Sequence, residues 1–203
     1  YERALRYYVA GLEYASSPYA FYTIGSTLAF NAAAYANVRG FPKRSAGEDF
    51  YLLNKLAKLG SIEFIEDSVI NIVARESDRV PFGTGPAVSN IIAKTRDSQA
   101  YYYYHPSVFE ALKHCLSSFK SLYQQRFEIQ NWLSEQPTHV ATALQNIGFN
   151  QFIDKNKSHT ELQFNKQLNV WFDAFKTLKF IHEVRDLKYA NIPLVDAIDT
   201  ANF

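Results

Sequence analysis

A change in hydrophobic pattern near residue 100 constrains the fold of this chain most strongly. Before it, short alternating stretches mix with short helical ones, whereas long helical patterns with few breakers follow it. Of the eight glycines, only Gly148 lies in the second half. We therefore predict two domains. Residues 1–100 are expected to form an α/β domain, an α+β arrangement with few strands, and residues 101–203 a mainly α-helical subdomain, so that the chain is helix-rich overall.

Length and charge limit the class of function. The 203 residues, 47% of them hydrophobic and 20% charged, are typical of a globular protein with a sizeable core. Lysine and arginine number 21 against 20 aspartates and glutamates, which gives a net charge of +1. Proteins that bind nucleic acid or anionic membranes usually carry a basic excess. The charge balance therefore argues against both partners.

Cysteine content and hydropathy bear on the compartment. The single cysteine, Cys115, excludes a disulfide scaffold and a cysteine-based zinc site, and its apolar surroundings predict a buried side chain. No apolar run reaches the roughly 20 residues of a transmembrane helix, and no signal peptide is visible. We expect a cytoplasmic protein without a transmembrane segment. The chain also lacks Met and begins inside a helical pattern, which predicts that it is part of a longer protein.

Three segments have strand-like patterns. Residues 21–30 alternate, with a second face of small side chains, and two short strands are expected at residues 61–65 and 69–74. The small face leaves room for a ligand or another backbone, and simple packing under a helix explains it equally well. The other elements expected in this half are helices over residues 5–15 and 31–37 and a polar loop over residues 78–86.

The sharpest local signal is a possible capping box at Ser45 and Glu48. It would begin a helix whose leucines face a core. Gly60 would end that helix in a left-handed conformation.

Long helical patterns fill the second half. Pro106 can begin a helix, residues 138–147 form a second one, and Ser158 with Glu161 matches another capping box that predicts a long helix through Ile181. The apolar stripe of the first of these helices consists of Phe109, Leu112, Leu116, Phe119, Tyr123 and Phe127.

Most residue types that carry chemistry show no recognisable spacing. The five histidines lack an HExxH pair, so surface or capping roles are expected and no metal site is predicted. Neither a P-loop nor a nucleophile elbow is present. Residues 82–85 place two glycines around Thr84, which is typical of a turn and only weakly of a phosphate cradle.

The adjacent acids Glu48 and Asp49 allow a structural and a functional interpretation. Asp49 in a first helical turn contributes roughly 0.3–1 kcal/mol through the helix dipole. A carboxylate placed there, behind a glycine, can also project into a cleft and act as a general base. Neighbouring helical residues point about 100° apart, which disfavours a hydrolase that uses the two as paired carboxylates.

Several segments resemble, in order and spacing, the acceptor-side half of family 2 glycosyltransferases with the GT-A fold. In that family a strand and a helix lead to a Gly-Gly-Phe-like turn, here Arg39-Gly40-Phe41, and then to a Gly-Glu-Asp helix start, here Gly47-Glu48-Asp49. The resemblance covers about the first hundred residues, and the matching segments are residues 23–35, 38–42, 47–60 and 69–85.

The resemblance implies a catalytic role for Asp49, which would deprotonate the acceptor hydroxyl for in-line attack on the anomeric carbon with inversion. Glu48 would orient that aspartate or the acceptor. Arg75 and Arg79 would hold the acceptor or the departing diphosphate, although surface ion pairs account for them almost as well. The other substrate-binding residues implied are Gly83, Thr84 and Gly85.

The family's nucleotide-binding half, with its Asp-x-Asp metal motif, precedes the acceptor strand, but only about twenty residues precede Phe21 here. The resemblance therefore implies a fragment that is inactive alone and contains no cofactor. Mg²⁺ or Mn²⁺, a sugar nucleotide donor and a hydroxyl acceptor are expected for the full-length enzyme. The alternative is a non-catalytic protein-binding or assembly module, and the helical region is a candidate for homo-oligomer contacts.

Overall fold

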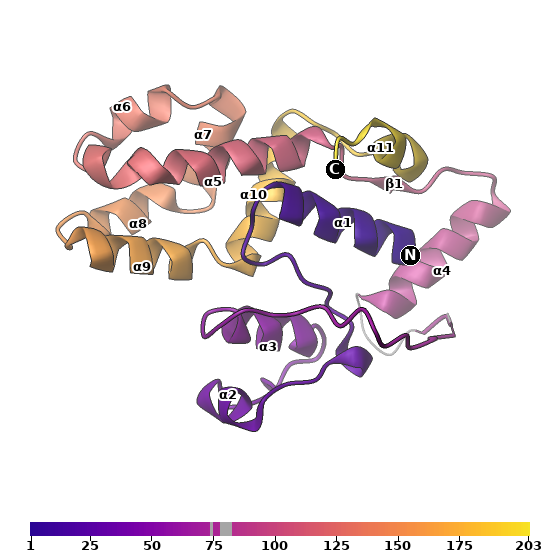
Figure 1. The fold of residues 1–203 in the computed structure, drawn as a ribbon. Coiled ribbons are helices and arrows are strands. Elements are labelled where there is room, and N and C mark those ends of the chain that lie inside the picture. The colour runs from indigo at the N-terminus through magenta and orange to yellow at the C-terminus, as the bar shows by residue number, and fades with distance from the viewer. Residues whose placement is uncertain (74, 78–82) are drawn as a thin grey trace. The chain divides into compact units, whose positions relative to one another are not determined.

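The computed structural model describes residues 1–73, 75–77 and 83–203. These residues form the α-helices α1 to α11, one 3₁₀ turn and two strands of two residues each (Figure 1). The chain divides into two compact units. Unit 1 comprises residues 1–10 and 18–102, and unit 2 comprises residues 11–17 and 103–203. The predicted helix-rich character is thus confirmed.

Unit 1 contains short helices joined by long irregular segments. Helix α1 begins in this unit and its residues beyond Ala10 belong to unit 2. The elements are α1 (Glu2–Tyr14), the 3₁₀ turn η1 (Gly25–Thr27), α2 (Ala32–Asn37), α3 (Glu48–Leu56) and α4 (Thr84–Arg96). Helix α2 begins where the sequence predicts it, because the Asn31 carboxamide oxygen accepts hydrogen bonds from the N–H groups of Ala33 and Ala34.

The start of α3 differs from the prediction. Gly47 is the N-cap, with φ +70° and ψ +19°, and no side chain caps this helix end. The capping box of Ser45 with Glu48 is therefore wrong. The chain enters the helix through a left-handed glycine, so Ser45 lies two residues before the N-cap and Glu48 is already the first helical residue.

The end of α3 also differs. The helix ends at Leu56, and the next N–H groups switch to shorter bonds, from Lys58 to the Lys55 carbonyl and from Leu59 to the Leu56 carbonyl. This tightening finishes the helix before Gly60 is reached. Gly60 has no positive φ, so the predicted left-handed stop at this residue is wrong.

The three predicted strands are wrong as well. Residues 21–30 contain η1 flanked by irregular backbone, and neither residues 61–65 nor residues 69–73 form a strand. Residue 74 lies outside the described residues. Alternation favours an extended chain, but a strand exists only where a neighbouring backbone pairs with it, and these segments have no such pairing within the described residues.

The loop predicted for residues 78–86 is only partly tested. Residues 78–82 lie outside the described part of the chain. Gly83 is the N-cap of α4 and the helix begins at Thr84, so the loop prediction is wrong for residues 84–86. Gly83 and Gly85, which favoured a loop, instead lie at the start of a helix.

Unit 2 is built from consecutive helices with one small strand pairing. Strand β1 (Tyr102–Tyr103), whose second residue is the first of this unit's long segment, pairs with β2 (Ile192–Pro193). The helices are α5 (Ser107–Gln125), α6 (Ile129–Ser134), α7 (Thr138–Asn146), α8 (Phe149–Asn156), α9 (Glu161–Trp171), α10 (Ala174–Leu187) and α11 (Leu194–Thr200). In the described chain, none of the helices has the length and apolar character required to span a bilayer.

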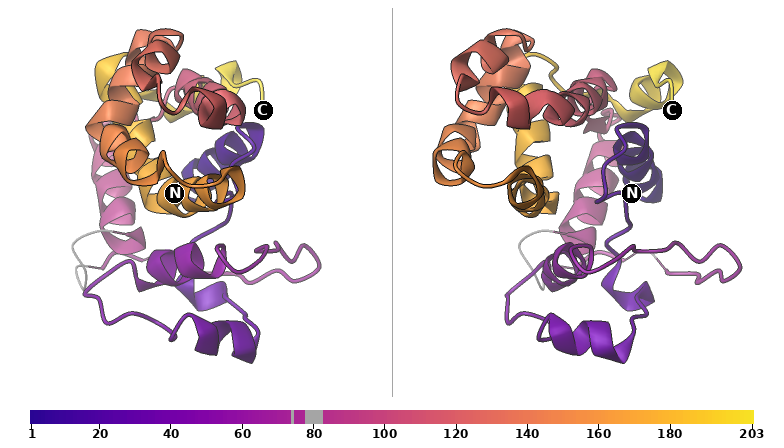
Figure 2. Two further views of the ribbon diagram at one scale, coloured as in Figure 1. Left: turned by 90° about the vertical axis from the view of Figure 1, so that its left-hand side faces the viewer. Right: turned by 60° about the vertical axis from the view of Figure 1, so that its left-hand side comes forward.

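An aromatic core holds unit 2 together. Helix α10 packs against α5 and α7, although α5 and α10 are far apart in sequence (Figures 1 and 2). Trp132 and Phe149 are fully buried with ring centroids 5.4 Å apart, and Phe119 meets Phe172 edge to face at 5.2 Å. Cys115 is buried as predicted, and this burial raises the pKa of its thiol.

Several helix boundaries in unit 2 need correction. Helix α5 ends at Gln125, so Phe127 leaves the predicted stripe and is 65% exposed. The capping box of α9 is formed by Thr160 and Gln163, two residues beyond the predicted Ser158 and Glu161.

The long helix predicted through Ile181 is two helices. Asp173 interrupts it, because its carboxylate accepts from the N–H groups of Phe175 and Lys176 at 3.1 and 3.2 Å and caps the start of α10.

A half-buried histidine, His182, makes the stability of unit 2 depend on pH. His182 Nε2 lies 2.7 Å from Tyr104 Oη, and its pKa is below the usual 6.5, first because burial disfavours the charged ring and then because of Arg185. The unfolded chain therefore binds this proton at higher pH than the folded chain does. The contribution of His182 to the free energy of unfolding is therefore fully present above pH 6.5 and is lost as the pH falls below that value.

We expect the thermal unfolding temperature to fall between about pH 7.5 and about pH 5.5. His182→Gln should flatten that slope, because it removes the group that titrates. Val195→Ala, at an exposed position of α11, removes no titrating group and serves as the control, which should leave the slope unchanged. The pKa of His139 is also lowered by burial, so some slope will remain in the His182 variant. An identical slope in both variants would contradict this account.

Candidate functional site

Asp49, the predicted catalytic residue, lies in the first turn of α3 and is partly exposed. Its Oδ2 accepts a hydrogen bond from the Gly25 N–H at 3.1 Å, and its Oδ1 lies 2.7 Å from the N–H of Phe50. These contacts fix the direction of the carboxylate. The side chain is therefore held in place but not sealed in a core.

Gly25 permits this arrangement. A Cβ added at Gly25 would lie 3.3 Å from both Cβ and Oδ2 of Asp49, tighter than ordinary van der Waals contact. The small side of residues 21–30 thus lets the η1 backbone approach a side chain of α3. Of the two explanations for the small side chains of residues 21–30, packing against a helix is the one observed at Gly25.

Glu48 has a different environment from that of its neighbour. It is exposed at the start of α3, whereas Asp49 is turned toward η1. The two acids therefore do not act as one cluster. This separation agrees with the angular argument against a paired-carboxylate hydrolase.

The aromatic turn that precedes α3 was missed as a candidate site. Phe30 stacks on Tyr35 with centroids 5.0 Å apart, and Phe41 meets both rings. The Phe41 N–H donates to Tyr35 Oη at 3.3 Å. Gly40 has φ +62° and its added Cβ would lie 2.8 Å from Tyr35 Oη, so this position requires glycine. The aromatic residues on either side of the Arg39-Gly40 turn are the sequence feature that could have predicted this cluster.

The remaining predicted residues have their own contacts. Thr84 Oγ1 donates to Tyr1 Oη at 3.2 Å, and a Cβ at Gly85 would lie 2.5 Å from the Ser77 carbonyl oxygen. Gly83 takes φ +104° as the N-cap of α4. These contacts are made by the first residues of α4, and they are separate from the contacts of Asp49 at the start of α3.

Of the two predicted arginines, Arg75 is exposed in an irregular segment. Arg79 lies outside the described residues.

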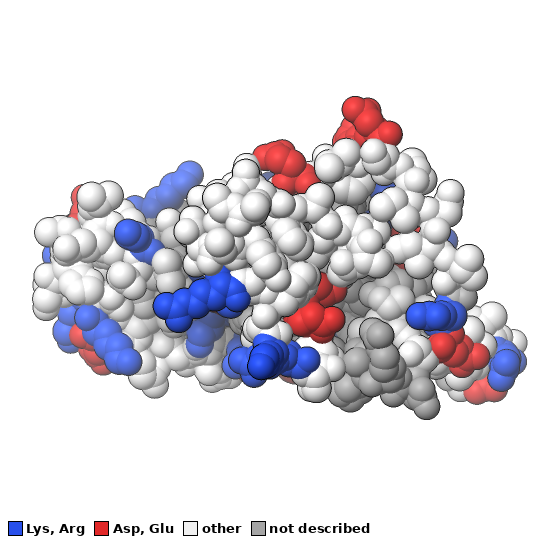
Figure 3. Space-filling view, turned by 90° about the horizontal axis from the view of Figure 1, so that it is seen from below, with Lys and Arg blue, Asp and Glu red and all other residues white. Residues whose placement is uncertain are grey.

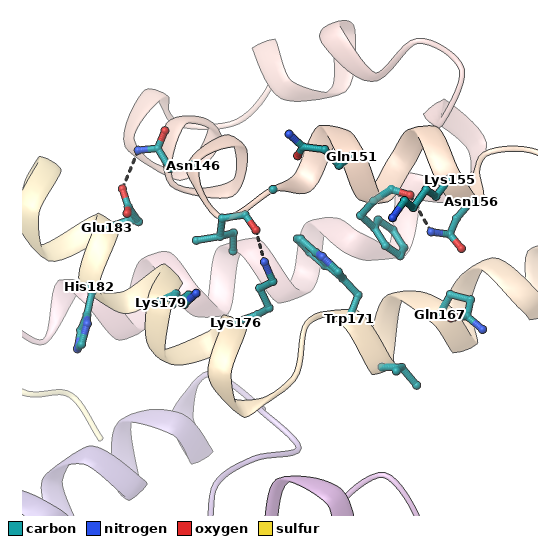
Figure 4. A pocket seen from close by; sticks show the side chains of 14 residues that line it. Asn146, Gln151, Lys155, Asn156, Gln167, Trp171, Lys176, Lys179, His182 and Glu183 are labelled. Atoms are coloured by element: carbon teal, nitrogen blue, oxygen red, sulfur yellow. Dashed lines mark hydrogen bonds between the residues drawn. The ribbon is translucent and has the colours of Figure 1, made fainter. Parts of the chain in front are cut away.

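On the face shown in Figure 3, basic and acidic side chains are interspersed among uncharged ones. Within the described ranges, no group of three or more His, Cys, Asp or Glu side chains could hold a metal ion. A hollow lined by lysines and amides lies in unit 2, among α8, α9 and α10, and sequence reasoning did not find it (Figure 4).

No protein-family model, curated protein or solved structure matches this chain. Any functional conclusion therefore depends on the residues and contacts described above, together with the sequence resemblance. Among these residues, Asp49 has the geometry most suited to acid–base chemistry.

Proposed function

We propose that this chain is the acceptor-side part of an inverting glycosyltransferase that uses a nucleotide sugar, with Asp49 as the general base. The observation that carries the proposal is the orientation of the Asp49 carboxylate. It is turned toward the Gly25 backbone at the start of α3 while it stays partly exposed. A general base must be held in a fixed direction and remain accessible to the proton it removes.

The proposed step conserves atoms and charge. An Asp49 oxygen accepts the proton of the acceptor hydroxyl as the hydroxyl oxygen forms a bond to the anomeric carbon. The bond from that carbon to the phosphate oxygen breaks on the opposite face, and the nucleoside diphosphate leaves with the electron pair. The configuration at the anomeric carbon is thereby inverted.

The exposed rings of Phe30 and Phe41 support an acceptor-binding role for the same region. They are 39% and 40% exposed and form one cluster with Tyr35. Aromatic faces of this kind pack well against the apolar faces of sugar rings. Glu48 is exposed beside Asp49 and can accept a hydrogen bond from a further acceptor hydroxyl.

The apolar side chains of residues 61–73 support the presence of the nucleotide-binding half that the resemblance implies. Val69 and Val73 are 82% and 87% exposed. Side chains with this pattern are normally buried in a sheet, and contiguous exposed apolar surface marks an interaction site. We propose that the strands that supply the donor site pack here.

Metal ions enter this proposal only through the resemblance. The described residues do not form a site for the Mg²⁺ or Mn²⁺ that the family uses. Such an ion would neutralise charge on the leaving diphosphate. Its ligands would have to come from outside the described residues, so we derive no step through it.

Titration calorimetry tests whether the 203-residue chain lacks a donor site, as the proposal requires. The 203-residue chain, mixed with UDP-glucose and Mn²⁺, should show no saturable heat up to millimolar concentration. The longer protein that contains this segment should bind the sugar nucleotide and transfer its sugar. Tight binding by the 203-residue chain would contradict the absence of a donor site. A longer protein that transfers no sugar from any nucleotide donor would overturn the proposed function.

An assembly module is the second candidate function, and the same exposed residues 61–73 favour it. The two candidates differ in their need for Asp49. An assembly module requires the apolar surface but no carboxylate directed by Gly25. Transfer activity in the longer protein would therefore decide between them.

A further inference from the structure

A polar pocket lies entirely within unit 2 and takes no part in the proposed transfer. It has a volume of about 860 Å³, within the range of about 300–1,000 Å³ that small-molecule sites occupy. Its walls come from the α7–α8 connection, α8, the end of α9 and α10 (Figure 4). The side chains that matter for the argument are Lys155, Lys176, Lys179, Trp171, Gln151 and Gln167.

The pocket has a positive charge. Lys155, Lys176 and Lys179 line it, and Glu183 is the one acid among its lining residues. The Glu183 Oε2 atom already accepts from Asn146 Nδ2 at 2.6 Å. The cationic side chains of the pocket thus outnumber its acid, although the chain as a whole is nearly neutral. This local positive charge favours an anionic ligand.

Two of these lysines are close enough to affect each other. Lys176 donates to the Ile147 carbonyl oxygen and lies over the Trp171 ring, 5.2 Å from its centroid. Its pKa is lowered first by burial and then by the charge of Lys179, with Asp173 acting in the opposite direction. A bound anion would lie favourably between two such ammonium groups.

The polar lining suits a ligand rich in hydroxyl groups. Gln151 and Gln167 are exposed along the pocket, and Asn146 and Asn156 line it as well. Gln151 and Gln167 each offer both a donor and an acceptor, as paired recognition of a sugar hydroxyl requires. The Nδ2 atoms of Asn146 and Asn156 already donate to Glu183 Oε2 and to the Phe152 carbonyl oxygen, and their amide oxygens can accept from a ligand. In Figure 4 these amides lie on both sides of Trp171 rather than at one point. A ligand that uses them must be extended.

The indole ring argues against a nucleic-acid strand. Phe152 stacks on Trp171 at 4.9 Å, and Lys176 lies over the same ring system. Strands of nucleic acid bind aromatic side chains by stacking bases on a free ring face. Here the ring is already in contact with the protein.

We propose that this pocket binds an acidic oligosaccharide, a short chain of sugar rings with at least two anionic groups. One anion lies between Lys176 and Lys179, a second meets Lys155, and the amides bind ring hydroxyls. The volume accommodates more than one sugar ring. The proposal does not depend on a transferase function, because none of these residues belongs to the region of Asp49.

Tryptophan fluorescence and titration calorimetry with the 203-residue chain test the proposal. Trp132 is fully buried and Trp171 lines the pocket, so a ligand-induced change in emission reports on Trp171. The probes are tetragalacturonate as the carboxylated form, a heparin tetrasaccharide as the sulfated form, neutral maltotetraose, and a dT4 oligonucleotide. Saturable binding of either acidic tetrasaccharide, without binding of maltotetraose or dT4, is expected. Whichever acidic probe binds more tightly identifies the anionic group.

Charge-matched variants separate a built site from general attraction. Lys155→Gln with Lys179→Gln should weaken binding about tenfold or more. Lys120→Gln with Lys166→Gln removes the same charge from exposed positions outside the pocket and should change affinity less than about twofold. Trp171→Phe should abolish the emission change. Equal losses in both double variants, equally tight binding of dT4 or maltotetraose, or no acidic probe binding at millimolar concentration would each overturn the proposal.

Discussion

Under the proposed transferase function, replacement of Asp49 by Asn should lower sugar transfer by the full-length protein about 10²- to 10⁴-fold, because general-base catalysis contributes about that much. Asn keeps the shape and one oxygen that can accept from Gly25 N–H. It cannot remove a proton from the acceptor. The effect should appear in kcat, measured by release of nucleoside diphosphate, with a smaller change in KM for the acceptor.

The stability of the Asp49→Asn variant is the decisive control. Loss of a carboxylate in a first helical turn costs only about 0.3–1 kcal/mol, so the unfolding temperature should change little. Asp97→Asn, at the exposed C-cap of α4, is the matched variant and should keep full activity. A large loss of stability with activity intact would assign the Asp49 carboxylate to the helix start alone.

Truncation of Trp132 to Ala should give the largest loss of stability, about 3–5 kcal/mol in the free energy of unfolding of unit 2. The side chain is 0% exposed, its ring lies 5.4 Å from that of Phe149, and its Nε1–H donates to Ser121 Oγ at 3.3 Å. The variant removes the ring contacts and leaves a cavity in the core. Urea unfolding followed by far-ultraviolet circular dichroism measures the change.

Val195→Ala is the matched control for Trp132→Ala. Val195 lies on α11 and is exposed, so its truncation should change the free energy of unfolding by less than about 0.5 kcal/mol. A loss below about 1 kcal/mol for the Trp132 variant would mean that the aromatic core does not limit the stability of unit 2.

Local patterns predicted the helices of unit 2 better than the irregular parts of unit 1. The apolar spacing and Pro106 indicated α5, and the residues before Gly148 indicated α7. A helix satisfies its own backbone hydrogen bonds, so its signal lies within a few residues of sequence. A strand needs a partner backbone, which is why the alternation of residues 21–30 was misleading.

Small boundary errors came from competing caps. Ser45 and Ser158 each matched a capping pattern, but Gly47 and Thr160 are the N-caps observed. Asp173 divides one predicted helix into two because its carboxylate can satisfy the first N–H groups of α10. Such competition between neighbouring candidates is decided by where the chain must turn to pack.

The sequence by itself determined the helix-rich character, the buried state of Cys115 and the acidic start of α3, because helical periodicity and burial of apolar residues depend on near neighbours. Only the tertiary structure placed the Gly25 N–H against the Asp49 carboxylate, a contact between residues 24 positions apart. It alone also brought Lys155, Trp171 and Lys176 from three helices around one pocket. Contacts between distant segments depend on how the elements pack, and packing distributes its free energy over many residues rather than over a local motif.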